Sequence, residues 1–150
     1  MPHDPSDRPY AGRFVDQAHL FAIRVYYEDT DAGGIVYHAN YLRFFERART
    51  DLLGLIGIDL GEALRAGHGG YVVVEAALKY RASARLGDAL TVVSEMIGLR
   101  KASCAVHQRV MRDGQVLVDG RLSLAFTGAD GRPRRQPAEW IRALEALQGD

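Results

Sequence analysis

Residues able to do acid–base or acyl-transfer chemistry gather between Tyr26 and Tyr41, in the stretch YYEDTDAGGIVYHANY. It contains three acids, two glycines and one histidine, namely Glu28, Asp29, Asp31, Gly33, Gly34 and His38. A carboxylate or an imidazole can move a proton, and the unpaired N–H groups at a helix start can stabilise negative charge on a bound group. The stretch therefore predicts a site for acid–base or acyl chemistry. The alternative is that residues 29–31 serve only as turn and N-cap residues.

The residues on either side of this stretch predict the elements that hold it. A strand with one apolar face is indicated by the alternating residues Phe21, Ile23, Val25 and Tyr27. From about Asn40 the period becomes helical, with an apolar stripe that comprises Tyr41, Phe44, Phe45, Ala48, Leu52 and Leu55. Gly54 and Gly57 indicate where this helix ends. The candidate site thus joins a strand to a helix start.

The second half of the chain alternates with a period of two and predicts four strands after a short helix at about 60–66. Their apolar faces comprise Val72 to Tyr80, Leu90 to Met96, Cys104 to Val110 and Val116 to Phe126. The dipeptide Asp113-Gly114 is typical of a tight hairpin, so the last three strands should form an antiparallel meander. A final helix is predicted over Pro137 to Leu147.

One substantial helix against about five antiparallel strands predicts an α+β fold that a single chain does not complete. A single helical stripe leaves sheet surface or an edge uncovered, so we expect a homodimer or homotetramer whose sites draw on two chains. Residues 1–18 carry proline, glycine and charge without a periodic pattern and are predicted to be a flexible tail. The folded domain is then expected to span residues 19–150.

Composition argues against several classes of function. The 19 basic and 19 acidic residues give a net charge of zero, which argues against broad contact with nucleic acid or an anionic membrane. No apolar run approaches the ~20 residues of a membrane span, and the N-terminal residues lack the apolar core of a signal peptide. The only cysteine, Cys104, alternates onto an apolar strand face, so we expect a core residue and a reducing, cytoplasmic location.

The pattern DTDAGGIVYHANY, which begins at Asp29, resembles the signature of the hotdog-fold acyl-CoA thioesterases of the 4-hydroxybenzoyl-CoA thioesterase group. The longer string VYYEDTDAGG, followed by YHA and FERART, is similar to the Tol–Pal-associated, YbgC-type acyl-CoA thioesterases. The resemblance covers roughly residues 21–127. It implies a hotdog fold, in which an antiparallel sheet wraps around one long helix and protomers dimerise, and it implies thioester hydrolysis.

The resemblance also implies roles for residues of the loop. Asp31 matches the catalytic aspartate, which could activate water as a general base or attack the carbonyl to form a mixed anhydride. Gly33 and Gly34 would let the backbone approach the substrate, and the amides around Tyr37 and His38 would donate to the thioester oxygen. The His38 side chain could orient water, bond the carbonyl or pack. We expect Asp29, the neighbouring acid, to shape the loop.

Basic residues near loop ends are candidates for holding the phosphates of coenzyme A. Arg81 and Arg85 lie in the segment YRASARLGD, which is similar to the family's loop after this strand, although Ser83 stands where the family often has proline. Arg100 and Lys101 lie at the turn between the next two predicted strands. Solvated surface positions are the alternative for all four cations.

Glu46 is a second acid, on the predicted helix. Some hotdog thioesterases place a catalytic glutamate on this helix, which makes Glu46 a candidate substrate-binding residue. Because the chain keeps the Asp31 pattern, the sequence favours the alternative role for Glu46, a solvated position on the helix or pairing with Arg47 or Arg49.

Together these observations predict an acyl-CoA thioesterase that acts as a homo-oligomer on an acyl-CoA or acyl-carrier-protein thioester. No metal or cofactor is expected, because the histidines show no paired ligand spacing and coenzyme A enters as part of the substrate. One alternative is a non-catalytic acyl-binding or scaffolding module associated with cell-envelope machinery, and another is a hydratase of the same fold. The intact Asp31 and glycine pair favour the thioesterase.

Overall fold

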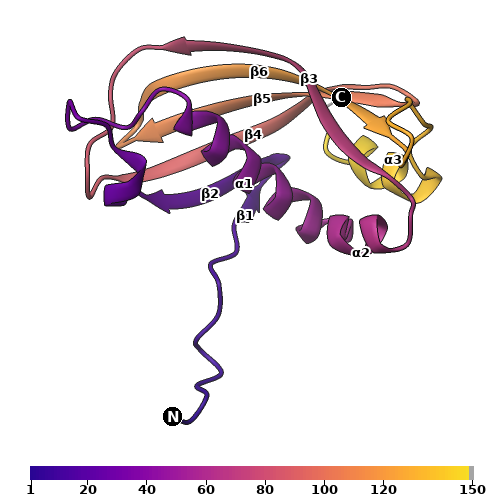
Figure 1. Cartoon of the computed structure of the whole chain (residues 1–150), viewed down its shortest axis with the longest axis horizontal. Coiled ribbons are helices and arrows are strands. Elements are labelled where there is room, and N and C mark those ends of the chain that lie inside the picture. Colours follow the sequence, from indigo (N-terminus) through magenta and orange to yellow (C-terminus); the bar gives the residue numbers. More distant parts are fainter. Residues whose placement is uncertain (149–150) are drawn as a thin grey trace.

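The computed structural model describes residues 1–148 and contains a six-stranded antiparallel sheet with one long helix across a face (Figure 1). The strands are β1 (Arg13–Val15), β2 (Ala18–Arg24), β3 (Gly70–Tyr80), β4 (Ala89–Leu99), β5 (Ser103–Arg112) and β6 (Gln115–Thr127). The helices are α1 (Asn40–Leu55), α2 (Leu60–Arg65) and α3 (Ala138–Glu145), with a short 3-10 turn, η1 (Tyr27–Asp29). The strand order is β1-β2-β4-β5-β6-β3. The predicted α+β architecture is confirmed, with six strands instead of about five.

The sixth strand is β1, which lies inside the segment predicted as tail. It pairs with β2, and this hairpin is held to α1 through Asp51. The Asp51 carboxylate accepts the Gly12 N–H at 2.9 Å and lies 2.7 Å from Nε2 of the fully buried His19. A tail extending to residue 18 was therefore a wrong prediction. A three-residue strand is too short to show a period, and the residues around it, Gly12 and His19, are held by Asp51 from a helix far along the chain.

The predicted apolar stripe of α1 forms the centre of the core, where Tyr41, Phe44, Phe45, Ala48 and Leu52 are buried. Two positions differ from expectation, because Leu55 is 45% exposed and Arg49 is buried. The Arg49 guanidinium pairs with Glu46 and donates to the Gln108 side-chain oxygen at 2.9 Å. A buried charge needs such partners, and helical periodicity cannot reveal a partner supplied by β5.

Phe45 fits against Gly120 of β6, and this contact yields a stability prediction. A Cβ on Gly120 would lie 2.6 Å from Cε2 of Phe45, whose side chain is fully buried. Gly120→Ala should therefore lower the free energy of unfolding by about 1–3 kcal/mol. The same substitution should cost less in a Phe45→Leu background, because the smaller side chain leaves room. Urea unfolding of the four proteins measures this coupling, and equal costs in both backgrounds would contradict it.

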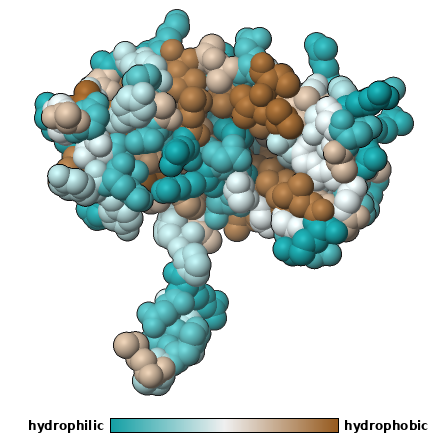
Figure 2. Space-filling model, in the orientation of Figure 1, coloured by the Kyte–Doolittle hydropathy of each residue, from teal (hydrophilic) through white to brown (hydrophobic). Residues whose placement is uncertain are grey.

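β3 forms one edge of the sheet and pairs only with β6 within the described residues. Val72, Val73 and Val74 are 50%, 41% and 63% exposed. β3 runs along the upper part of the molecule (Figure 1), where the same view shows a hydrophobic patch on the surface (Figure 2). A bulge between Val73 and Glu75 breaks the alternation predicted from Val72 to Tyr80. A long apolar edge of this kind is a surface on which another chain can add a strand.

The expected meander joins β4, β5 and β6, and both residues of the Asp113-Gly114 turn have positive φ, at 49° and 78°. The sheet thus has two ends. At one end, which we call the loop end, β2 and β3 finish, β4 begins and α1 starts. The opposite end carries the β4–β5 turn and α3 (Figure 1).

None of the helices within residues 1–148 has both the length and the apolar character needed to cross a bilayer.

Candidate active site

The loop between β2 and α1 is shaped by Asp29, as predicted. The Asp29 side chain is buried, and its Oδ2 accepts the Tyr26 N–H at 2.8 Å. The Asp29 carbonyl oxygen accepts the Tyr37 N–H at 3.0 Å and the Asn40 side-chain amide at 2.9 Å. These three bonds connect the start of the loop, its return segment and the first residue of α1. They replace the conventional side-chain cap, which α1 lacks at its N-cap residue Ala39.

Asp31 lies at the tip of this loop, in a tight turn with its side chain exposed. Its carbonyl oxygen accepts the Gly34 N–H at 3.0 Å, and its Oδ1 accepts the Gly33 N–H at 2.8 Å. Gly34 has a φ of 79°, which a side chain disfavours, and a Cβ on Gly33 would lie 3.2 Å from the Asp31 carboxylate. The two glycines therefore orient the carboxylate, with one oxygen held by the backbone and the second, on an exposed side chain, without a described partner.

Only one of the two amides expected to polarise a carbonyl is open. The Tyr37 N–H is already bonded to the Asp29 carbonyl, so the expectation that it donates to substrate is wrong. The Tyr37 carbonyl oxygen accepts the Asn40 N–H at 2.8 Å, which directs it into the helix start. Because C=O and N–H of one trans peptide point in opposite directions, the His38 N–H points away from the helix. No acceptor for it occurs within residues 1–148.

Asp31 and His38 line the same cleft of about 300 Å³ at the loop end of the sheet. The other residues that line it are Ile35, Val36, Tyr41, Tyr80, Arg81, Ala82 and Ser83. Of the predicted site residues, the structure thus brings together Asp31, His38 and Arg81. Gly33, Gly34 and Tyr37 support the cleft from the loop behind it and are not among its lining residues.

The loop from β3 to β4 forms the second wall of the cleft. It pairs with the loop between β2 and α1. The Val36 N–H donates to the Ala84 carbonyl at 2.9 Å, and the Ala84 N–H donates to the Tyr41 hydroxyl at 3.1 Å. Arg85, a predicted phosphate ligand, lies opposite Ile35 in this pairing. The site is therefore built where two loops meet, and neither loop alone defines it.

Arg112 holds this wall in place through its side chain, a role that the sequence did not indicate. Its guanidinium donates to Asp88 Oδ2 at 2.7 Å and to the Ser83 carbonyl at 3.2 Å. The Arg85 N–H, and after it the Arg112 guanidinium, hold the pKa of the Asp88 carboxyl below its usual range. The position of Arg112 directly before the Asp113-Gly114 turn was visible in the sequence, but the register that brings it to Asp88 was not.

The structure does not bring the four predicted coenzyme A ligands together in one chain. Arg81 and Arg85 lie at the loop end, whereas Arg100 and Lys101 follow the other end of the 11-residue strand β4. At about 3.3 Å per residue, that strand separates the two pairs by roughly 33 Å. The backbone carbonyls of Arg100 and Lys101 accept the Gln136 side-chain and backbone N–H groups, which tie this turn to the segment before α3.

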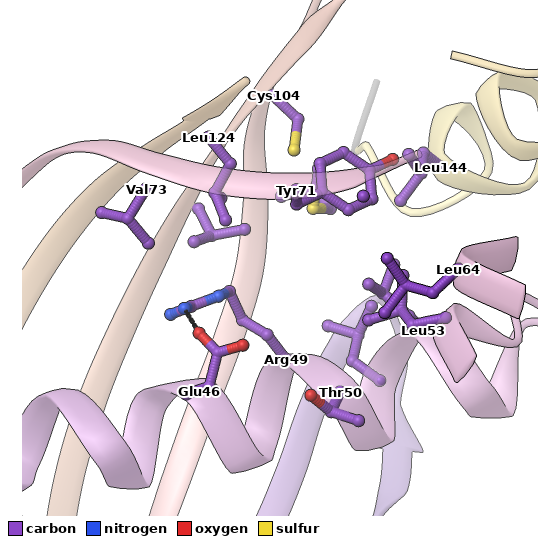
Figure 3. Close-up of a pocket in the computed structure, with 15 residues that line it drawn as sticks. Glu46, Arg49, Thr50, Leu53, Leu64, Tyr71, Val73, Cys104, Leu124 and Leu144 are labelled. Carbon is purple, nitrogen blue, oxygen red and sulfur yellow. Dashed lines mark hydrogen bonds and ion pairs between the residues drawn. The ribbon is translucent and has the colours of Figure 1, made fainter. Parts of the chain in front are cut away.

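Glu46 also lies outside the Asp31 cleft, at the mouth of a second cavity of about 210 Å³ between α1 and the sheet (Figure 3). Its carboxylate pairs with Arg49, while Tyr71, Leu124 and Leu144 close the opposite side (Figure 3). The walls are otherwise almost entirely apolar. Cys104 lines this cavity, and burial raises the pKa of its thiol to about 11, which suits the predicted core role.

Comparison with known proteins gives a consistent family. Residues 25–146 match the family model described as "Thioesterase-like superfamily". The chain is 40% identical over 111 residues to an acyl-CoA thioesterase YbgC of Haemophilus influenzae, across 74% of this chain and 82% of the relative. It is 42% identical over 97 residues to an acyl-CoA thioester hydrolase YbgC of Escherichia coli, across 65% and 72% of the two chains.

The fold is shared with solved structures. A hypothetical protein from Thermus thermophilus superimposes with a TM-score of 0.80 at 31% identity, covering 86% of this chain and 98% of that one. A probable thioesterase from Bartonella henselae gives a TM-score of 0.75 at 32% identity, covering 80% and 99%. The hotdog fold expected from the sequence is thus confirmed. The chain belongs to the thioesterase-like superfamily and, within it, to the YbgC-type acyl-CoA thioesterases.

Proposed function

We propose that this chain hydrolyses acyl-CoA thioesters to a carboxylate and free coenzyme A, with Asp31 as the catalytic carboxylate and the His38 N–H polarising the carbonyl. The observation that carries the proposal is the single cleft lined by an oriented, exposed carboxylate and by the residue whose N–H remains open at a helix start. Family membership supports it, because the YbgC relatives are acyl-CoA thioester hydrolases.

The chemistry follows from these two groups. Asp31 removes a proton from an attacking water, or attacks the thioester carbonyl itself to give a mixed anhydride that water then cleaves. In either route negative charge develops on the carbonyl oxygen, and the His38 N–H at the positive end of the 16-residue helix α1 stabilises it. The thiolate of coenzyme A leaves and takes up a proton. We assign the His38 imidazole, a further group at this cleft, to orienting the water.

A panel of acyl-CoA substrates, read by release of free thiol, tests the proposal directly. Turnover of at least one acyl-CoA well above the rate in buffer is the expected result. Binding of acyl-CoA without thiol release would instead favour the alternative, a non-catalytic acyl-binding or scaffolding module associated with cell-envelope machinery. The same panel should include aliphatic and aromatic acyl groups, each as a coenzyme A and as a carrier-protein thioester. It then identifies both the acyl group and the carrier that the protein prefers.

We propose that the complete site forms in a homodimer through β3. Two copies of an edge strand that pair antiparallel around a two-fold axis run in opposite directions. The α3 end of the partner's sheet then lies beside the loop end of this chain. Arg81 and Arg85 of this chain and Arg100 and Lys101 of the partner subunit could therefore hold one coenzyme A between them. The partner's apolar cavity, with Glu46 as a substrate-binding residue at its mouth, would receive the acyl group.

The phosphate-binding role of these cations predicts a specific kinetic change. Alanine at Arg81, Arg85, Arg100 or Lys101 should raise KM with kcat nearly unchanged, because a distant phosphate contact stabilises ground state and transition state alike. Each lost contact should lower kcat/KM about ten- to a hundredfold, the scale of about 1.5–3 kcal/mol for a charge-assisted bond. Steady-state kinetics with acyl-CoA at several salt concentrations measure the effect.

Two controls separate phosphate binding from a general surface effect. An acyl-N-acetylcysteamine thioester lacks the nucleotide, so its KM should be the same for every variant and nearly independent of salt. Arg13→Ala, on the far edge strand β1, removes an exposed arginine away from the site and should leave acyl-CoA kinetics unchanged. Unchanged acyl-CoA KM values in all four variants would show ordinary surface cations.

A further inference from the structure

Tyr80, the last residue of β3, ties the end of the edge strand to the start of α1. Its hydroxyl donates a hydrogen bond to the His38 backbone carbonyl oxygen at 3.0 Å, across 42 residues of sequence. Its ring packs edge-on against the His38 ring and the Tyr41 ring, with centroids at 6.2 and 5.8 Å. Both the hydroxyl and the ring of Tyr80 therefore bear on the residue whose N–H is open.

The direction of the His38 N–H depends on two peptide groups that meet at its Cα. The group before it is held through the Tyr37 carbonyl, which accepts the Asn40 N–H at 2.8 Å. The group after it is held through the His38 carbonyl, which accepts the Tyr80 hydroxyl. Peptide groups are planar, so only φ and ψ of His38 relate the two planes. With both planes hydrogen-bonded, the His38 N–H has little freedom to change direction.

The loop itself does not supply this second bond. Within residues 1–148 no backbone N–H donates to the His38 carbonyl oxygen, and its donor is the Tyr80 hydroxyl, which comes from β3. We propose that the Tyr80 hydroxyl is a positioning group that holds the His38 N–H toward the thioester carbonyl. This inference rests on the proposed function, because it assigns the His38 N–H to the reacting carbonyl.

Tyr80→Phe removes the hydroxyl and keeps the ring, so it isolates the bond. The kcat should fall about three- to tenfold, the scale of one neutral hydrogen bond, while KM stays within about twofold. A bond that orients the oxyanion donor matters more in the transition state than in the bound ground state, and this produces the split between kcat and KM. The melting temperature and the oligomeric state of the same sample should match those of the unaltered protein.

A spectroscopic measurement checks the position of the N–H without turnover. An acyl-CoA with a labelled carbonyl carbon is bound to Asp31→Asn protein, and its carbonyl stretching band is recorded with and without the additional Tyr80→Phe substitution. A carbonyl that accepts a hydrogen bond vibrates at lower frequency than a free one, so this lowering should be smaller when the hydroxyl is absent. Tyr10→Phe is the matched control, since Tyr10 is 56% exposed in the N-terminal segment. It should change neither kcat nor the band.

Two results would overturn the inference. A raised KM with unchanged kcat would mean that the Tyr80 hydroxyl contacts substrate directly. Unchanged kcat together with an unchanged carbonyl band would mean that the loop holds the His38 N–H without Tyr80. If the unaltered protein releases no thiol from any acyl-CoA, the proposed function fails, and the carbonyl band of bound acyl-CoA still decides whether Tyr80 positions the N–H.

Discussion

Asp31→Asn should lower kcat at least about 100-fold while the protein stays folded, the usual scale for a positioned acid–base or nucleophilic group. The substitution is conservative in structure because asparagine retains an oxygen that can accept the Gly33 N–H now bonded to Oδ1 at 2.8 Å. It removes the negative charge that either catalytic route requires. Thiol release from the best acyl-CoA of the panel, measured beside circular dichroism and thermal unfolding, provides the test.

Asp16→Asn is the matched control for this prediction. Asp16 lies in the turn between β1 and β2 with a φ of 53°, a conformation that asparagine also tolerates, and it is remote from the cleft. The control should keep full activity. A folded Asp31→Asn protein with near-normal turnover would contradict the assignment of Asp31 and would turn attention to Glu46, the acid at the mouth of the other cavity.

Placing lysine at Val72 and Val74 should convert the protein to a monomer. At low protein concentration its activity should then fall by roughly a hundredfold, the scale expected when groups of a site are no longer held in position. Both side chains are at least half exposed on the edge strand, so the substitutions disturb little internal packing. In a symmetric pair each new charge is duplicated across the interface, and lysine on an edge strand opposes pairing. Light scattering at micromolar concentration and activity on the same samples measure both effects.

Concentration dependence distinguishes lost assembly from lost folding. If the variant is a folded monomer, its specific activity should rise with protein concentration as the dimer re-forms. Val15→Lys is the matched control, because Val15 is an exposed valine, at 43%, on the opposite edge strand β1. It should leave the dimer and the activity intact. An unaltered protein that is monomeric at micromolar concentration, or a fully active monomeric variant, would refute a site shared between two chains.

The sequence by itself determined the local parts of this protein. The change of period at Asn40 predicted where α1 starts, and its end at Leu55 agrees with the Gly54 signal. The Asp113-Gly114 dipeptide predicted its hairpin, whose two residues have the positive φ angles that this turn requires. The role of Asp29 in shaping the loop was also predictable. Apart from the Asp29 bonds to Tyr37 and Asn40, each of these features depends on neighbours within a few residues, which periodicity and turn preferences report.

Only the tertiary structure decided how these parts form a site. Strand order made β3 an edge and brought Tyr80 to the His38 carbonyl. Strand register brought Arg112 to Asp88, and sheet length separated Arg81 from Arg100. None of these follows from a local pattern, because a hydrogen bond between elements depends on which strands are adjacent and how far each is shifted. The same holds for which backbone amide can donate to a substrate. The Tyr37 N–H becomes unavailable only when the loop folds back and this N–H bonds to the Asp29 carbonyl.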